Sequence, residues 1–184
     1  LPYHLLIDLV RSILGIPFGL PEGEARARLD RELAALLADP SAAADTAPYL
    51  AQLLDLPLLP GEAERTRVDP DILQGRLLAA TLRLLRGMAA RGPVVLVCED
   101  LHWADPASIE VARQVMPLAT QLPILFVAAL RADTDSPGWA LIGHGRETFG
   151  EALTEITLEP LSEADSRTLV SNLLEIESLP EHVR

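Results

Sequence analysis

The stretch VVLVCEDLHWADPAS, residues 94–108, decides the fold. Its first five residues, Val94 to Cys98, are apolar and mostly β-branched, which is typical of a strand buried on both faces of a parallel sheet. Two acids, Glu99 and Asp100, follow directly. Because ligands of open α/β sheets bind beyond the carboxyl ends of the strands, the stretch predicts a buried strand that delivers two carboxylates to a ligand site.

Glu99 and Asp100 are the candidate catalytic and metal-binding residues. A carboxylate at this position can hold Mg²⁺ through water, since Mg²⁺ keeps much of its hydration shell, and the neighbouring acid can polarise an attacking water. The alternative interpretation is a pair of solvated acids that closes a strand. A motif this short is often matched by chance.

The next residues make the pattern more specific. His102 is a candidate hydrogen-bonding residue for a phosphate, which makes it a cofactor-binding candidate. Trp103 is expected to pack the turn against the sheet, and Asp105 to cap the next helix. Each residue taken singly is better explained by a structural role, so the information lies in their order after two acids on a buried strand.

A second apolar run, ILFVAAL at residues 124–130, predicts a neighbouring strand that ends at Arg131. A guanidinium at that edge can reach a γ-phosphate, so Arg131 is also a cofactor-binding candidate. The alternative is an ion pair with Asp133 or Asp135. Cys98 is expected to be a small buried apolar residue rather than a nucleophile.

Apolar residues three and four positions apart predict helices elsewhere in the chain. The expected helices cover residues 5–14, 22–38, a short piece around 49–54, 70–91, 106–121 with a kink at Pro117, 139–149 and 162–176. A loop is expected over residues 57–68 and a weaker strand over residues 153–158. Strands that alternate with helices predict right-handed βαβ crossovers and an α/β fold with a parallel sheet.

Composition limits the possible functions. The net charge of −12 disfavours direct binding to nucleic acid or to anionic membranes. The sequence has one cysteine, no signal peptide and no apolar run of the ~20 residues that a membrane span needs, so a reduced, cytoplasmic setting is expected. All 15 Lys and Arg residues are Arg. The chain therefore offers no lysine to a phosphate-binding loop.

Taken together, PVVLVCEDLHWADPAS, LPILFVAALRAD and ITLEPLSEADSRTLV resemble the STAND branch of AAA-type P-loop ATPases, the modules found in LuxR-type regulators and beside cyclase or kinase domains. The resemblance implies that Glu99 holds the Walker B magnesium position, that Asp100 is the adjacent acid and that Arg131 is a sensor arginine. Most members of the family have Asp where this chain has Glu99, and the Gly that usually stands before the sensor Arg is absent here, where Ala128 and Ala129 stand instead.

The resemblance also implies an architecture, a partial P-loop NTPase (ASCE-type) three-layer sandwich preceded by a helical segment. Residues 1–68 would be that helical segment, residues 69–160 the α/β core with the Walker B and sensor strands, and residues 161–184 the start of a lid-like helical region. The family's G-x-x-x-x-G-K-[ST] loop is absent from this sequence. ATP and Mg²⁺ are then cofactors of an intact parent protein, and the chain by itself is expected to be inactive.

Two functions remain open at this point. The first is a nucleotide-dependent switch in a larger regulatory protein, and the second is a non-catalytic interaction scaffold that retains the ATPase fold. The expected partners are the remaining parts of the parent polypeptide, namely an upstream Walker A region and a downstream helical domain. Open sheet edges also predict self-association. An α/β hydrolase is disfavoured because no G-x-S-x-G string is present.

Overall fold

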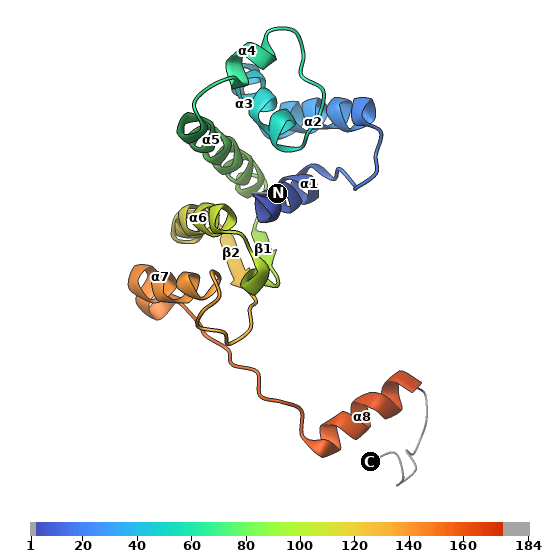
Figure 1. Ribbon diagram of the computed structural model, residues 1–184, viewed down its shortest axis with the longest axis vertical. Coiled ribbons are helices and arrows are strands. Elements are labelled where there is room, and N and C mark those ends of the chain that lie inside the picture. The colour runs from blue at the N-terminus through green and yellow to red at the C-terminus, as the bar shows by residue number, and fades with distance from the viewer. Residues whose placement is uncertain (1–2, 175–184) are drawn as a thin grey trace. The chain divides into compact units, whose positions relative to one another are not determined.

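The computed structural model describes residues 3–174 of the 184-residue chain (Figure 1). The chain divides into two compact units, residues 1–150 and residues 151–184. The first unit contains seven α-helices and two strands among its described residues. In chain order they are α1 (His4–Leu14), α2 (Glu22–Leu36), α3 (Pro40–Leu53), α4 (Glu62–Thr66), α5 (Pro70–Ala89), β1 (Val94–Cys98), α6 (Pro106–Val115), β2 (Ile124–Ala128) and α7 (Trp139–Phe149).

Three helices begin with the same local device, an Asp followed by Pro. Asp39, Asp69 and Asp105 each precede a proline in the first turn, and each carboxylate accepts a backbone N–H of that turn. The proline has no N–H to leave unsatisfied there, so the pair fixes the start of a helix. These starts are local in sequence, which is why the predicted starts of α5 and α6 are confirmed.

β1 and β2 form a parallel two-stranded sheet, as the apolar runs predict. Val94 pairs with Ile124 and Cys98 with Ala128, so the strands are in register over their full length. β2 ends at Ala128 rather than at the predicted Leu130. The described residues are mostly helical, consistent with a partial α/β fold of the P-loop type.

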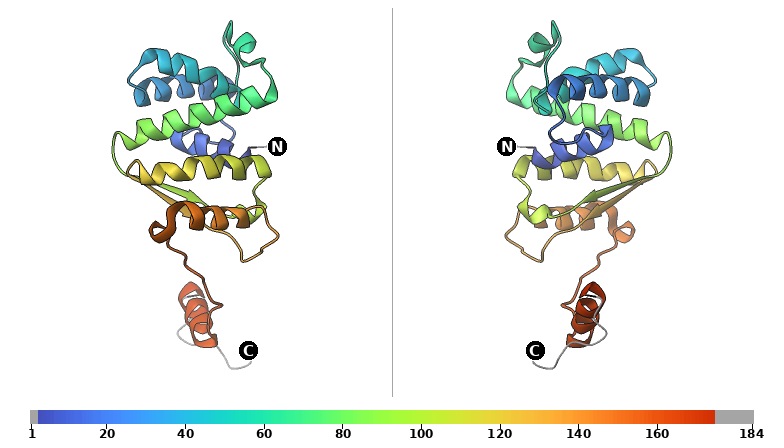
Figure 2. Two further views of the ribbon diagram at one scale, coloured as in Figure 1. Left: turned by 90° about the vertical axis from the view of Figure 1, so that its left-hand side faces the viewer. Right: turned by 90° about the vertical axis from the view of Figure 1, so that its right-hand side faces the viewer.

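The main hydrophobic core joins the helices to one face of the sheet. It contains buried side chains of α1, α2, α3 and α5 together with Val94, Leu96, Ile124 and residues of α6. A smaller cluster around Cys98, Leu101 and Leu141 connects the end of β1 with α6 and α7. Helices α6 and α7 lie on the same side of the two strands (Figures 1 and 2).

The opposite face of the sheet is open, so the prediction of a strand buried on both faces is wrong for this chain. Val95 is 60% exposed and Val97 57%, while Leu125 and Val127 on the neighbouring strand are also exposed. These four side chains point away from the core because successive residues of a strand alternate between faces. We call them the open sheet face. The described residues supply cover for one face only.

The predicted loop over residues 57–68 contains a short helix, α4. Glu62 is buried there and forms a bidentate pair with Arg26 of α2, at 2.6 and 2.8 Å between nitrogen and oxygen. The hydrogen bonds from Arg26 lower the pKa of the Glu62 carboxyl despite its partial burial. A long-range ion pair therefore orders a segment whose local composition predicts a loop.

Pro117 was expected to kink a helix over residues 106–121, but the α-helix ends just before it. Helix α6 ends at Val115, and residues Met116–Thr120 continue as the 3₁₀ helix η2. Proline has no N–H to donate to the carbonyl four residues earlier, so the regular α-helix stops beside it.

The strand predicted over residues 153–158, which belongs to the second unit, is wrong. These residues have no regular secondary structure, and Ile156 and Leu158 are exposed. A strand is stabilised by hydrogen bonds to a neighbouring strand, and none is formed by residues 153–158. Alternating apolar residues are therefore not enough to form a strand here without a neighbouring strand to pair with.

The second unit does contain the predicted final helix, α8 (Glu163–Leu174). Ser162 caps it, since the Ser162 hydroxyl accepts the Asp165 N–H at 3.1 Å and donates to the Asp165 carboxylate at 2.6 Å. The last two residues of the predicted helix, 175 and 176, lie outside the described residues. No described helix has the length and apolar character needed to cross a membrane.

Candidate functional site

The carboxyl ends of β1 and β2 form the edge at which the sequence predicts a site. Two backbone hydrogen bonds extend the pairing past the strands, from Ala129 N–H to the Cys98 carbonyl at 2.9 Å and from Leu101 N–H to the Ala129 carbonyl at 3.1 Å. Glu99 and Asp100 lie between the two bonded positions of one chain segment, and Arg131 follows two residues after Ala129 in the other. The acids and the arginine thus share one edge of the sheet.

Asp100 makes the turn out of β1. Its backbone is in the left-handed region, at φ 53° and ψ 33°. Aspartate adopts this region more readily than most residues other than glycine. The Asp100 carbonyl accepts the Trp103 N–H at 2.8 Å, which begins the 3₁₀ helix η1 (Leu101–Trp103). Both acidic side chains lie at the surface, where water, a metal ion or a phosphate can reach them.

His102 is the buried polar residue of this edge. Its side chain is only 8% exposed, and its Nε2 lies 3.9 Å from Asp100 Oδ1. Neither ring nitrogen has a hydrogen-bond partner. A buried polar atom without a partner costs free energy, so such groups are rare and require an explanation. The imidazole therefore has unused hydrogen-bonding capacity next to an exposed carboxylate.

Trp103 does not pack the turn against the sheet, and that prediction is wrong. Its side chain is 76% exposed, and its ring centroid lies 5.3 Å from that of His102 with the rings inclined by 46°. Leu101 is the residue that anchors the turn, because it is fully buried in the cluster with Cys98 and Leu141. The exposed indole is left as a large apolar surface at the edge of the site.

Gly138 belongs to the site although the sequence does not single it out. It is buried directly before α7, and a Cβ atom on it would lie 2.4 Å from the Leu101 carbonyl oxygen and 3.2 Å from the His102 backbone nitrogen. Only glycine allows the chain to approach η1 this closely. The only local signal is the Ser-Pro-Gly string, which indicates a turn but not what the turn contacts.

Asp105 caps α6 as predicted and also holds a second helix. The carboxylate accepts the Ser108 N–H at 3.0 Å and, from the start of α1, the Tyr3 and His4 N–H groups at 3.2 Å each. The Leu5 N–H donates to the Ser108 hydroxyl at 3.2 Å. One acid therefore ties together two helix starts about a hundred residues apart, which no local motif can reveal.

The pKa of Asp105 reflects this arrangement. Burial alone would raise it, but the hydrogen bonds from Ser108, Tyr3 and His4 outweigh burial and hold the Asp105 pKa below its usual value. The carboxylate form is therefore the one that the fold stabilises.

Arg131 is exposed at the surface. Its backbone carbonyl accepts the Asp133 N–H at 2.8 Å, and within the described residues its guanidinium forms no ion pair with Asp133 or Asp135. The predicted alternative, an ordinary ion pair with one of these acids, is therefore not formed.

Cys98 is buried, in agreement with the prediction of a small apolar role. Burial raises the pKa of its thiol to about 11. Because the thiolate is the reactive form, this environment suppresses nucleophilic chemistry at the sulfur.

The site fits a metal that is held mainly by water and phosphate. No group of three or more His, Cys, Asp and Glu side chains suited to hold a metal is present among residues 3–174. Mg²⁺ does not need one, since it is usually bound through one or two carboxylates together with waters and substrate phosphates. Glu99 and Asp100 match that requirement.

Comparison with known families decides the classification. The sequence profile of the AAA ATPase domain matches residues 9–127. The chain belongs to the AAA ATPase domain family. The matched residues run from α1 to β2 and include Glu99, Asp100 and His102, whereas Arg131 lies beyond them. The resemblance to AAA-type P-loop ATPases is thereby confirmed, and with it a nucleotide-binding type of module.

One relative is an uncharacterized protein of Rhizobium meliloti (strain 1021), which is 31% identical over 71 residues. That stretch covers 39% of this chain and 7% of the relative, so the chain corresponds to a small part of that protein. No solved structure matches the chain.

Proposed function

We propose that this chain carries the Walker B and sensor portion of a STAND-type signalling ATPase module, which acts as a nucleotide-dependent switch in a larger regulatory protein. The observation that carries the proposal is the shared edge: Glu99 and Asp100 leave β1 where Arg131 leaves the neighbouring parallel strand. Membership of the AAA ATPase domain family supports nucleotide as the ligand. The lysine and the phosphate-binding loop would come from an upstream part of the parent polypeptide.

Each side chain then has a definite role in the intact parent. Bound magnesium would neutralise charge on the phosphates. Glu99 would hold the metal through water, and Asp100 would orient and polarise the attacking water. Arg131 would contact the γ-phosphate with its guanidinium fork, which is not paired with either neighbouring acid. His102, beside Asp100, would form a hydrogen bond with a phosphate group.

The chain by itself should bind Mg-ATP poorly. It has no lysine, and acidic side chains alone repel a triphosphate. Isothermal titration of the 184-residue chain with Mg-ATP should give no saturable binding at micromolar concentrations. A micromolar dissociation constant that Arg131→Gln weakens would show that the proposed dependence on an upstream phosphate-binding loop is wrong.

The catalytic roles are tested in the parent polypeptide with its phosphate-binding loop. Asp100→Asn should lower ATP turnover by about 100-fold or more, which is the usual scale for a residue that acts on the reacting water, while nucleotide binding is retained. Glu99→Gln should also lower turnover, because it weakens the hold on the metal. Glu110→Gln changes the same charge on the exposed side of α6 and should leave turnover unchanged. Equal losses in all three variants would reject these roles.

The open sheet face favours a second function, a non-catalytic interaction scaffold that retains the ATPase fold. Four neighbouring apolar side chains, Val95, Val97, Leu125 and Val127, are exposed together. Such surfaces mark interaction sites. In the parent, the rest of the module would cover this face; in the chain alone, the open face and strand edges would promote self-association.

Light scattering over a range of concentrations tests self-association. The chain should form dimers or larger species, and Val95→Ser with Val97→Ser should shift it towards the monomer. Leu59→Ser removes an exposed leucine outside the sheet and serves as the control. A monodisperse monomer at all concentrations contradicts self-association. A parent whose phosphate-binding loop lacks its lysine would favour the scaffold over the switch.

A further inference from the structure

A separate concave site lies among α3, α4 and α5, away from the carboxyl ends of the strands. Its cavity has a volume of about 320 Å³. The walls include three arginines, one acid, one aromatic ring and two exposed aliphatic side chains. They are Arg65, Arg76, Arg83, Asp45, Tyr49, Val68 and Ile72.

The three arginines converge on one stretch of α3 although they come from two other helices. Arg65 of α4 donates to Asp45 Oδ1 through Nη2 at 2.8 Å and to the Ala44 carbonyl through Nη1 at 3.3 Å. Arg83 of α5 lies 3.4 Å from the Thr46 hydroxyl. Arg76, also of α5, sits over the Tyr49 ring with its Cζ 6.0 Å from the ring centroid. Three guanidinium groups therefore gather around little more than one turn of helix.

The charge of this site is opposite to that of the chain. Three arginines face a single lining acid, Asp45, in a protein whose net charge is −12. Each guanidinium has five N–H donors, and the contacts to α3 use few of them. Like charges that are brought together repel each other, so an anion in the cavity would add to the compensation that Asp45 supplies to the three guanidinium groups.

We propose that this cavity binds a phosphate monoester of a small, partly apolar molecule. Guanidinium forks match phosphate oxygens in bidentate pairs, and the local excess of two positive charges matches the charge of about −2 of a phosphate monoester at neutral pH. The cavity volume is at the lower end of the ~300–1,000 Å³ range of small-molecule pockets. The exposed side chain of Ile72 supplies an apolar contact for the organic group.

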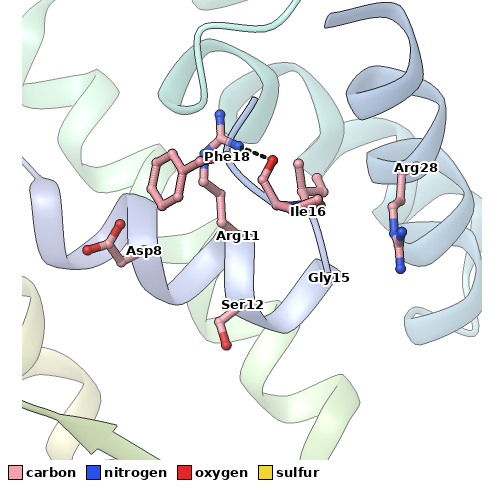
Figure 3. Close-up of a pocket in the computed structure, with 8 residues that line it drawn as sticks. Asp8, Arg11, Ser12, Gly15, Ile16, Phe18 and Arg28 are labelled. Carbon is pink, nitrogen blue, oxygen red and sulfur yellow. Dashed lines mark hydrogen bonds between the residues drawn. The ribbon is translucent and has the colours of Figure 1, made fainter. Parts of the chain in front are cut away.

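A second hollow, in the first unit, lacks this convergence. It lies between α1 and α2 and has a volume of about 540 Å³. Arg11 donates there to the Pro17 carbonyl at 3.3 Å and stacks on Phe18 with its Cζ 4.7 Å from the ring centroid. Arg28 stands well apart from Arg11, on the other side of Ile16 (Figure 3). The two guanidinium groups do not face one ligand position.

Titration of the 184-residue chain with phenyl phosphate and with inorganic phosphate tests the proposal by calorimetry. Phenyl phosphate should bind saturably and more tightly than inorganic phosphate, because only the ester uses the apolar wall. Arg76→Gln with Arg83→Gln should weaken phenyl phosphate binding by about tenfold for each guanidinium removed, the scale of an exposed charge-assisted hydrogen bond.

Arg31→Gln with Arg113→Gln is the matched control. It removes the same two charges from exposed positions on α2 and α6, so it should change the affinity by less than about twofold if the effect is local. Equal weakening in both double variants would reduce the effect to net charge and overturn the proposal. Thermal unfolding of both variants verifies that the fold is retained.

Asp45→Asn provides a test with the opposite sign. This change removes the negative charge of the one acid among the lining residues, so phenyl phosphate should bind severalfold more tightly. Benzoate, a monoanion with the same ring, should bind at least about tenfold more weakly than phenyl phosphate, since it carries half the charge. Equal binding of benzoate, or no saturable binding of phenyl phosphate, would overturn the proposal. None of these outcomes depends on ATP hydrolysis.

Discussion

The two faces of the β1–β2 sheet have the same kind of side chains but different surroundings. Val94, Leu96 and Ile124 are buried in the main core, whereas Val95, Val97 and Leu125, one position further along each strand, are exposed. The difference shows that apolar residues on both faces of a strand indicate that both faces can be buried, but do not indicate which elements bury them. In this chain α5, α6 and α1 contribute to the core of one face, and the described residues leave the other open.

The largest expected effect compares neighbouring residues on the two faces. Leu96→Ala should lower the free energy of unfolding by about 2–5 kcal/mol, because it leaves a cavity in the core. Val97→Ala should change it by less than about 0.5 kcal/mol, the usual range for a surface position. Urea unfolding of both variants measures the difference. Equal losses would mean that the open sheet face is covered in solution.

Gly138→Ala tests the packing that holds η1 on the covered side. The new Cβ would lie 2.4 Å from the Leu101 carbonyl oxygen, so backbone must move, at a cost of about 1–3 kcal/mol. Gly143→Ala is the control within α7, where nothing lies within 4 Å and alanine should stabilise the helix by about 0.5–1 kcal/mol. Opposite signs in thermal unfolding are expected; the same sign in both would contradict the close approach of Gly138.

Asp105→Ala should lower stability by about 1–2 kcal/mol near neutral pH, because it uncaps α6 and releases the start of α1. The Asp105 pKa is lowered in the folded state. Its contribution is therefore complete above the usual Asp pKa of about 3.9 and is lost as the pH falls through the lowered value. The difference in the free energy of unfolding between this variant and the unsubstituted chain should shrink in that acidic pH range.

Asp69→Ala is the matched control for Asp105, since Asp69 caps only its own helix. It should cost less than Asp105→Ala in urea unfolding at neutral pH. If the two losses are equal, the additional hydrogen bonds from Tyr3 and His4 contribute nothing to stability.

The last comparison of the two faces changes stability least and is measured by thiol labelling. Cys98 should react slowly with a thiol reagent at pH 8, since a pKa of about 11 leaves only ~10⁻³ of the thiol as thiolate. Val97→Cys combined with Cys98→Ser places the thiol on the open sheet face, where labelling should be faster by about 100-fold or more, as for an ordinary thiol pKa of about 8.5. Equal labelling rates would contradict the conclusion that one face of the sheet is buried and the other is exposed.

The sequence predicts well what depends on neighbouring residues. Asp105 is predicted as a cap because the carboxylate reaches an N–H only three residues away, and β1 is predicted because five apolar residues adjoin one another. The segment 153–158 fails for the opposite reason, since a strand requires a partner from elsewhere. Trp103 fails because the choice of Leu101 as the buried residue of the turn depends on the position of α6 and α7.

The candidate site divides in the same way. Glu99, Asp100, His102 and Arg131 could be found from the order of residues, and the structure places the acids and the arginine on one edge. The contact of Gly138 with η1 and the tie from Asp105 to α1 could not be found, because they join segments tens of residues apart. The same holds for the arginines around α3.

By itself the sequence determined the family, the acids that follow the first strand, the absence of lysine and most helix boundaries, since each depends on residue identity or on contacts within one turn. The tertiary structure alone decided which sheet face is covered, which residue anchors the turn and which arginines share a cavity. These depend on which distant segments meet when the core excludes water, and the order of residues within one segment does not encode that choice.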